Sequence, residues 1–281
     1  MNNYFNIFFI MCSIIGIISL IRILIYKYEN SLIFQPDKIN EIDANHILGN
    51  YNDDNRISNR RIKTIDGELL DILFYNNVDH PDKLLIYFHG NAGNIYDDIQ
   101  LLPKFGKKNS VLMWDYRGYG LSTGVPTEGD VHTDILAVWF YVTEQLNYKP
   151  HNVTFYGRSL GCSFALWLGK KIIKNGGELP KGIIIESGFY NLQDIANEMV
   201  IFGGYFINSK LNNIKYIQKI NKRIPILIIH SQEDEIIGIH HALKLLNDGG
   251  YDRNSLVVIN GGHNSIIRSE EYYRKVESFM N

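Results

Sequence analysis

Residues 152–163 read NVTFYGRSLGCS, and this stretch decides the fold. Residues 153–156 are β-branched and aromatic, which predicts a short buried strand. The G-x-S-x-G of residues 157–161 follows, and the apolar residues of 163–171 then recur at helical spacing. A serine at a sharp turn between a strand and a helix is the arrangement of a nucleophile elbow, so Ser159 is predicted to be a nucleophile. The competing interpretation is an ordinary strand-to-helix turn.

The residues around Ser159 fit the chemistry of an elbow. Gly157 and Gly161 lack Cβ atoms, so the strand and the helix can approach each other closely around the turn. The start of the helix offers free N–H groups and the positive end of its dipole to a developing oxyanion. The N–H of Leu160, directly after the serine, is the expected first donor of an oxyanion hole.

Composition limits the classes of function. The chain has 281 residues, 45% hydrophobic and 21% charged, which suits one large α/β domain with a short extension. Its net charge of -2 and scattered basic residues give no reason to expect nucleic-acid binding. Two cysteines, Cys12 and Cys162, are too few for a disulfide framework. The sequence has no C-x-x-C or H-E-x-x-H motif, so neither a metal nor a cofactor is expected.

Residues 4–25 form a continuous apolar run long enough to span a bilayer. A signal peptide would need basic residues before the run and a small-residue cleavage site after it, whereas the first basic residue is Arg22. A soluble core helix would normally keep a polar face. Residues 1–28 are therefore predicted to be a single-pass membrane anchor. Arg22 and Lys27 flank its C-terminal side and weakly favour a cytosolic catalytic domain, but the orientation stays open.

Residues 29–59 are polar and rich in Asn and Asp, and are interpreted as a connector. The predicted catalytic domain covers residues 60–281. It opens with a hairpin, because Asp66-Gly67 is a strong turn signal between the apolar-rich segments 61–65 and 68–75. These two strands are expected to be antiparallel and to lie at the edge of the sheet.

Beyond the hairpin, strand and helix patterns alternate, which is typical of a mainly parallel sheet covered on both faces. The fold class is α/β, with an eight-stranded sheet, helices on both faces and the N-terminal membrane helix. Further strands are expected at 84–88, 111–114, 153–156, 183–186, 226–230 and 256–259, and helices at 94–107, 127–145, 163–171, 238–246 and 269–280. The segment 187–223 is less regular and only partly helical.

A catalytic serine needs a base oriented by an acid, and in such a sheet these follow the serine in the order acid, then His. The loop after strand 226–230 contains Glu233, Asp234 and Glu235, and the loop after strand 256–259 contains His263 behind two glycines. His263 is the predicted base. Asp234 is the preferred acid because its short side chain has little rotamer freedom, but spacing alone leaves Glu233 and Glu235 open.

The second donor of an oxyanion hole normally comes from the loop after an earlier strand. The small, Gly-rich residues 89–94 follow strand 84–88, and the N–H of Asn91 is the predicted donor, with Ala92 as the alternative. A plain Gly-rich turn is the competing interpretation. A phosphate-binding loop would show a Walker or G-x-G-x-x-G pattern, and neither is present.

Other polar residues near these loops are expected to be structural. Asp115 and Arg117 lie close to a strand end and are expected to form a pair that shapes their loop. His240 and His241 are expected to be surface groups on a helix.

Five motifs in order resemble the α/β-hydrolase superfamily: HGNAGN, DYRGYGLSTG, YGRSLG, HSQEDEIIG and GGHN. The resemblance covers residues 30–281 and is greatest to the membrane-anchored, prolyl-oligopeptidase-related branch of bud-emergence-type proteins. It implies Ser159 as nucleophile, Asp234 rather than its glutamate neighbours as acid, and His263 as base. Relatives with depalmitoylating thioesterase activity make lipid thioesters one candidate substrate.

The expected function is a membrane-anchored serine hydrolase that cleaves an ester or thioester bond in a small-molecule or lipid acyl substrate. The expected reaction needs no cofactor, and no nucleic-acid partner is expected. Two alternatives remain, a catalytically silent scaffold at a membrane and a peptidase or amidase.

Overall fold

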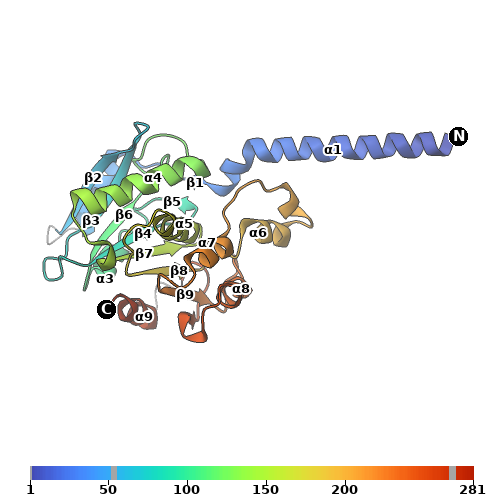
Figure 1. Ribbon diagram of the computed structural model, residues 1–281. Helices are drawn as coiled ribbons and strands as arrows, with labels where there is room; N and C mark the ends of the chain where they lie inside the picture. Colours follow the sequence, from blue (N-terminus) through green and yellow to red (C-terminus); the bar gives the residue numbers. More distant parts are fainter. Residues whose placement is uncertain (1, 52–55, 266–269) are drawn as a thin grey trace.

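A computed structural model describes residues 2–51, 56–265 and 270–281, and an eight-stranded sheet forms the centre of the domain (Figure 1). In spatial order its strands are β10 (Leu256–Ile259), β9 (Ile226–Ser231), β8 (Gly182–Glu186), β7 (Val153–Arg158), β4 (Leu84–Phe88), β6 (Ser110–Trp114), β3 (Leu69–Tyr75) and β2 (Ile57–Lys63). The strands from β10 to β6 are parallel, and β3 is antiparallel to both β6 and β2. The sheet is therefore mixed and mainly parallel, as predicted.

The helices and short turns lie between and around these strands. They are α1 (Asn2–Ile33), α2 (Glu41–Tyr51), α3 (Leu101–Phe105), α4 (Glu128–Phe140), η1 (Tyr141–Gln145), η2 (Pro150–Asn152), α5 (Gly161–Lys174), α6 (Leu192–Met199), η3 (Gly203–Phe206), α7 (Asn213–Ile220), α8 (His240–Asp248), η4 (Arg253–Ser255) and α9 (Glu270–Met280). A separate two-stranded pairing joins β1 (Gln35–Pro36) to β5 (Ala92–Gly93).

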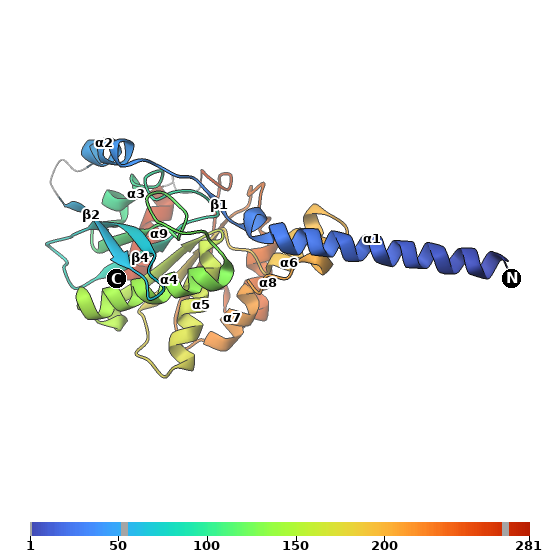
Figure 2. The ribbon, with the colours of Figure 1, turned by 90° about the horizontal axis from the view of Figure 1, so that it is seen from above.

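The sheet separates two hydrophobic cores, one on each of its faces. Side chains alternate along β4, so that Leu84, Ile86 and Phe88 pack with α4, α5, α7 and α8, while Leu85 and Tyr87 pack with α2, α3 and α9. This alternation is the two-residue period of a strand, and it explains why β4 is apolar throughout. Figure 2 shows α4, α5 and α7 on one side of the sheet and α2, α3 and α9 on the other.

The predicted hairpin is present, but its first strand begins at Ile57 rather than 61, because Ile57 to Lys63 pair in register with Tyr75 to Leu69. Thr64 N–H donates to the Glu68 carbonyl (2.8 Å) across the turn. The connector region contains helix α2. The side chain of Asn40 accepts hydrogen bonds from the N–H groups of Ile42 and Asp43 at the start of this helix.

The helix predicted over 94–107 is wrong for its first half, because only α3, at Leu101–Phe105, is helical in this range. Asp97 Oδ2 accepts the N–H of Asn94 (3.0 Å), and Asp115 Oδ1 accepts the N–H of Ile95 (2.9 Å). These carboxylates hold the backbone in successive turns, which side-chain hydrogen bonds favour over a helix. By contrast, the helix expected over 127–145 is present as α4 and the π-helical turn η1, with Thr127 as its N-cap.

Helix α1 extends away from the domain (Figure 1). Residues Asn6–Ile33 have a mean hydropathy of 2.6 in their most apolar stretch, none of which is buried. Its length and composition fit a membrane-spanning helix, and a signal sequence near the N-terminus has the same features. Its last residue, Ile33, and the adjacent Phe34 enter the main core, where the Phe34 ring stacks on Phe164.

Candidate active site

Ser159 lies at the turn between the central strand β7 and helix α5. Its φ of 52° is in the left-handed region, which is costly for a residue with a side chain and is frequent at functional sites. Its N–H donates to the carbonyl of Glu186 (2.8 Å), so the neighbouring strand β8 helps to hold the turn. The strand, turn and helix predicted around Ser159 are all present.

Two glycines allow the close approach that this turn requires. A Cβ atom on Gly161 would lie 2.0 Å from the carbonyl oxygen of Phe88 in β4, and one on Gly157 would lie 2.6 Å from Cα of Cys162. Real side chains essentially never come so close. The thiol of Cys162 is buried beneath the turn and donates to the carbonyls of Gly157 (3.1 Å) and Glu186 (3.2 Å). The elbow therefore accommodates a cysteine by giving its S–H two acceptors.

Asp234 and His263 are brought together although they are 29 residues apart. His263 Nδ1 lies 2.8 Å from Asp234 Oδ2 and 2.9 Å from Oδ1, and both residues are buried. Burial alone would raise the pKa of Asp234, but hydrogen bonds from His263 and from the N–H groups of Ile236 and Ile237 outweigh it and lower that pKa. The carboxylate is thus held ionised against the imidazole ring.

Glu233 and Glu235 are exposed while Asp234 points inward, as expected for neighbours in an extended loop. Neither glutamate is free. Glu235 Oε2 accepts the backbone N–H of His263 (2.9 Å), and Glu233 Oε2 accepts that of Gly261 (3.2 Å). The glutamates thus hold the backbone of the histidine loop, and Asp234 holds its ring.

Ser159 follows the carboxyl end of β7, and His263 lies in the loop after the carboxyl end of β10. Because β7 and β10 are parallel, with β8 and β9 between them, both residues lie at the same end of the strands. Among the described residues, no hydrogen bond joins Ser159 Oγ to His263. Arg158 links their loops: its guanidinium donates to Asn264 Oδ1 (2.9 Å), and its Nε lies 3.3 Å from Glu186 Oε1. The residue before the serine is therefore tied to the residue after the histidine.

The loop after β4 lies beside the serine. A Cβ atom on Gly90 would lie 3.7 Å from Ser159 Cβ. The carbonyl of Asn91 accepts hydrogen bonds from Gln35 N–H (2.9 Å) and the Tyr119 hydroxyl (2.7 Å), which fix the orientation of this part of the loop. Within the described part of the chain, neither the Asn91 N–H nor the Leu160 N–H has an acceptor. Two donors are thus available close to the serine.

The expected pair between Asp115 and Arg117 is wrong, because each has other partners. Arg117 Nη2 lies 2.6 Å from Asp134 Oδ1, and Arg117 Nη1 lies 2.8 Å from Asp66 Oδ2, so this arginine joins helix α4 to the β2–β3 turn. Asp115 is fully buried, which raises its pKa, and lies 3.5 Å from His89 Nε2. Burial lowers the pKa of His89 to about 3, so its ring is a neutral support under the loop of residues 89–94.

Sequence reasoning did not find Glu186, which is completely buried at the end of β8. The hydroxyls of Tyr156 and Tyr272 donate to its Oε2, and Arg158 lies against its other oxygen. The only sign of Glu186 in the sequence is its position as a single acidic residue at the end of an apolar strand. The partners come from β7 and α9, which no local pattern relates to β8.

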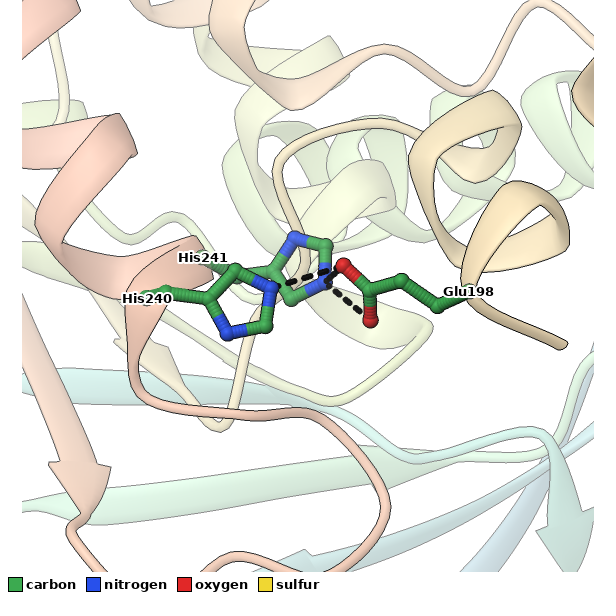
Figure 3. Close-up of side chains that lie close together, drawn as sticks. All are labelled: Glu198, His240 and His241. Carbon is green, nitrogen blue, oxygen red and sulfur yellow. Dashed lines mark hydrogen bonds and ion pairs between the residues drawn. The ribbon is translucent and has the colours of Figure 1, made fainter.

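One group of side chains among the described residues has the composition of a metal site, namely Glu198, His240 and His241 (Figure 3). Glu198 Oε1 lies 2.7 Å from His240 Nε2 and 3.1 Å from His241 Nε2. His241 Nδ1 accepts the N–H of Tyr190 (3.1 Å), so in the neutral ring Nε2 carries the proton and is a donor rather than a free ligand. The group therefore fits a carboxylate clamp between α6 and α8 better than a metal site. His241 is buried, which corrects its expected surface position.

Comparison with known proteins agrees with this architecture. A family model described as alpha/beta hydrolase fold matches residues 83–175. The uncharacterized protein R595 of Acanthamoeba polyphaga mimivirus is 33% identical over 274 residues, which cover 90% of this chain and 92% of that protein. Alpha/beta hydrolase domain-containing protein 17B of Homo sapiens is 26% identical over 224 residues, covering 78% of this chain and 73% of that protein.

Solved structures show the same fold. An alpha-beta hydrolase from Vibrio vulnificus has a TM-score of 0.75 at 19% identity, over 91% of this chain and 93% of that one. The esterase Pf2001 of Pyrococcus furiosus has a TM-score of 0.65 at 18% identity, over 88% of this chain and 97% of that one. With the sheet order, the serine turn and the sequence relatives, these likenesses lead to one conclusion: the chain belongs to the α/β-hydrolase superfamily.

Proposed function

We propose that this protein is a serine hydrolase that cleaves an ester or thioester bond, with Ser159, Asp234 and His263 as its catalytic triad. One observation carries the proposal: Ser159, in a left-handed backbone conformation, and the buried pair of Asp234 and His263 lie at the same end of the parallel strands. Esterases of the same fold support hydrolysis as the class of reaction. The hydrolase relatives found in the sequence comparison point the same way.

In the proposed reaction, Ser159 Oγ attacks the acyl carbonyl carbon and His263 Nε2 takes the hydroxyl proton. Asp234 accepts the Nδ1–H of His263, which leaves Nε2 as the base and stabilises the imidazolium. The N–H groups of Asn91 and Leu160 donate to the oxyanion of the tetrahedral intermediate.

His263 then returns its proton to the leaving alcohol or thiol as the bond from the carbonyl carbon to oxygen or sulfur breaks. A water molecule repeats the sequence on the acyl-enzyme and releases the acid, which restores Ser159. The steps need no cofactor.

We further place the protein in the membrane-anchored, prolyl-oligopeptidase-related branch of the superfamily, with α1 as a single-pass anchor and a lipid acyl group as a candidate substrate. The exposed apolar surface of α1 supports the anchor. The likeness to alpha/beta hydrolase domain-containing protein 17B supports grouping the chain with hydrolases of this general type.

Labelling with a fluorophosphonate tests the nucleophile. The wild-type protein should form one covalent adduct, and Ser159→Ala should form none. Ser187→Ala is a matched control, because Ser187 also follows a central strand with a positive φ of 48° and should be dispensable for labelling. A folded wild-type protein that resists the probe would favour the scaffold, and equal labelling of Ser159→Ala would place the nucleophile elsewhere.

A further inference from the structure

Residues 199–205, which we name the apolar loop, expose large hydrophobic side chains on one short segment. Ile201 is 82% exposed and Phe202 77%, and Met199, Val200 and Tyr205 are also exposed. The loop reads MVIFGGY and carries no charge. Single exposed apolar residues are common, but contiguous ones mark interaction surfaces.

The loop has a defined backbone conformation. Gly203 N–H donates to the Val200 carbonyl (2.7 Å), and Gly204 N–H donates to Asn197 Oδ1 (2.8 Å). Phe202 has a φ of 62°, a left-handed conformation that bulky residues rarely adopt. The chain thus keeps a disfavoured backbone conformation at a position where its aromatic ring faces solvent, which is typical of a functional surface.

The loop is joined to α1. The guanidinium of Arg22 donates to the Tyr205 hydroxyl (3.5 Å) and lies 5.2 Å from the centre of its ring. Two turns further along α1, Glu29 Oε1 accepts the N–H groups of Asn208 and Ser209, both at 2.7 Å. In Figures 1 and 2 the α6–η3 segment lies beside α1 and is the part of the domain that reaches farthest toward the N-terminus of that helix.

The length of α1 sets the level of the loop relative to a bilayer. The apolar run of residues 4–25 lies within this helix and, at a rise of about 1.5 Å per residue, is long enough to cross the hydrocarbon layer of about 30 Å. Arg22, the first charged residue of the chain, lies one turn before the end of this run, so its side chain can extend to the headgroups, where arginine and tyrosine side chains are favoured. Tyr205 contacts Arg22 and therefore lies at the same level.

We propose that the apolar loop inserts into the interfacial layer of the membrane that α1 spans, as a second membrane contact of the domain. The inference rests on the proposed role of α1 as a membrane anchor. A bilayer fits better than a protein partner because the apolar loop lies beside the membrane helix and has no charged residue of its own, so that a neutral lipid surface is sufficient. The segment that carries the loop begins at Ser187, directly after β8, and β8 lies beside β7, so the contact would hold the end of the sheet that carries Ser159 close to the lipid.

The test uses the full-length protein with Cys12→Ser, in which the remaining cysteine, Cys162, is buried. Ile201→Cys is labelled with the fluorophore NBD, and the protein is reconstituted into phosphatidylcholine vesicles that contain lipid with a quenching doxyl group high on the acyl chain. Ile65→Cys is the matched control, because Ile65 is 96% exposed in the β2–β3 turn, on the side of the domain remote from the free end of α1.

Quenching at position 201 several-fold stronger than at position 65 would support the proposal. Equal, weak quenching at both positions in protein that floats with the vesicles would overturn it while leaving the anchor intact. Protein that does not float would overturn the anchor and the loop contact together. Failure of the triad would appear only in the fluorophosphonate experiment, so the two proposals are judged separately.

Discussion

At the scale of single residues, the candidate site depends on backbone positions as much as on side chains. Ser159 occupies a left-handed conformation whose cost is of the order of 1–3 kcal/mol. Hydrogen bonding from Ser159 N–H to β8 and the absence of Cβ atoms at Gly157 and Gly161 make this conformation possible.

Asp234→Asn should lower kcat by a factor on the order of 10⁴, because the amide stabilises the wrong tautomer of His263 and removes the charge opposite the imidazolium. Glu233→Gln and Glu235→Gln should each cost less than about tenfold, because these exposed side chains keep an oxygen that can accept the backbone N–H of the histidine loop. The measurement is kcat for a short-chain aryl ester, with circular dichroism as the check on folding. A large loss in either glutamine variant with little loss in Asp234→Asn would require a triad drawn around that glutamate.

Gly161→Ala should destabilise the fold, because its methyl group would meet the Phe88 carbonyl at 2.0 Å. We expect a loss of about 1–3 kcal/mol in the free energy of unfolding, the usual cost of overpacking, together with loss of activity. Gly129→Ala is the control, because open space surrounds that glycine in α4. Urea denaturation measures both, and an unchanged midpoint for Gly161→Ala would show that β4 and the elbow can separate without cost.

At the scale of secondary-structure elements, α6 differs from α7, the next helix between β8 and β9, because α7 is packed into the main core and α6 is not buried. Helix α6 has no buried residue, and Glu198 near its end is clamped by His240 and His241 of α8 (Figure 3). A second ion pair, Lys244 with Asp194 at 3.3 Å, joins the same two helices. Elements with few buried apolar contacts open most easily, so α6 is the helix expected to move first.

Acid should loosen α6. Burial lowers the pKa of His241 below 6.5 despite the attraction of Glu198, so its contribution to stability is lost as the pH falls below about 6.5. Burial would raise the pKa of Glu198, but its histidine partners lower it below 4.5, so its contribution is present above about pH 4.5 and is lost on further acidification. His241 therefore predicts faster hydrogen exchange in α6 at pH 5 than at pH 7, after correction for intrinsic rates, and Glu198 adds to this effect only below about pH 4.5.

Glu198→Ala should produce the same opening at pH 7, with exchange in α6 faster by about three- to tenfold, as expected for a partly exposed ion pair. Glu178→Ala is the control, since it removes another Glu–His contact, to His151 at 2.6 Å, on a different part of the surface. Mass spectrometry of peptides from α6 provides the measurement. Unchanged exchange in Glu198→Ala would mean that the clamp does not hold the helix.

At the scale of the whole molecule, α1 is the part that the domain does not bury. The large apolar side chains described from Ile10 to Leu24 are exposed, whereas Ile33 and the adjacent Phe34 belong to the core. One end of the helix is thus integrated into the α/β domain, and burial of the remaining apolar side chains would need another apolar surface.

Carbonate extraction tests the anchor. The full-length protein should remain in the membrane pellet, because the burial of about 20 apolar residues resists alkaline washing. A chain that begins at Tyr28 should stay in the supernatant, since it keeps Glu29 for Asn208 and Ser209 and Phe34 for the core. Release of the full-length protein by carbonate would rule out a membrane-spanning α1.

The sequence by itself determined what depends on local pattern: the order of the sheet-forming segments, the serine turn, the cap at Thr127 and the apolar N-terminal helix. Alternation, helical spacing and turn residues encode these features over a few neighbouring residues. The same local logic overestimated the helix at 94–107, because the decisive hydrogen bond to Ile95 comes from Asp115, twenty residues away.

Only the tertiary structure decided which side chains meet. It placed Arg158 between Glu186 and Asn264, attached the two exposed glutamates to the backbone of the histidine loop, and set the apolar loop beside Arg22. These contacts join residues separated by up to 183 positions, and no periodic pattern in the sequence predicts them. Their geometry follows from how β7, β8 and β10 are ordered in the sheet and from the angle at which α1 leaves the domain, and packing of the whole chain sets both.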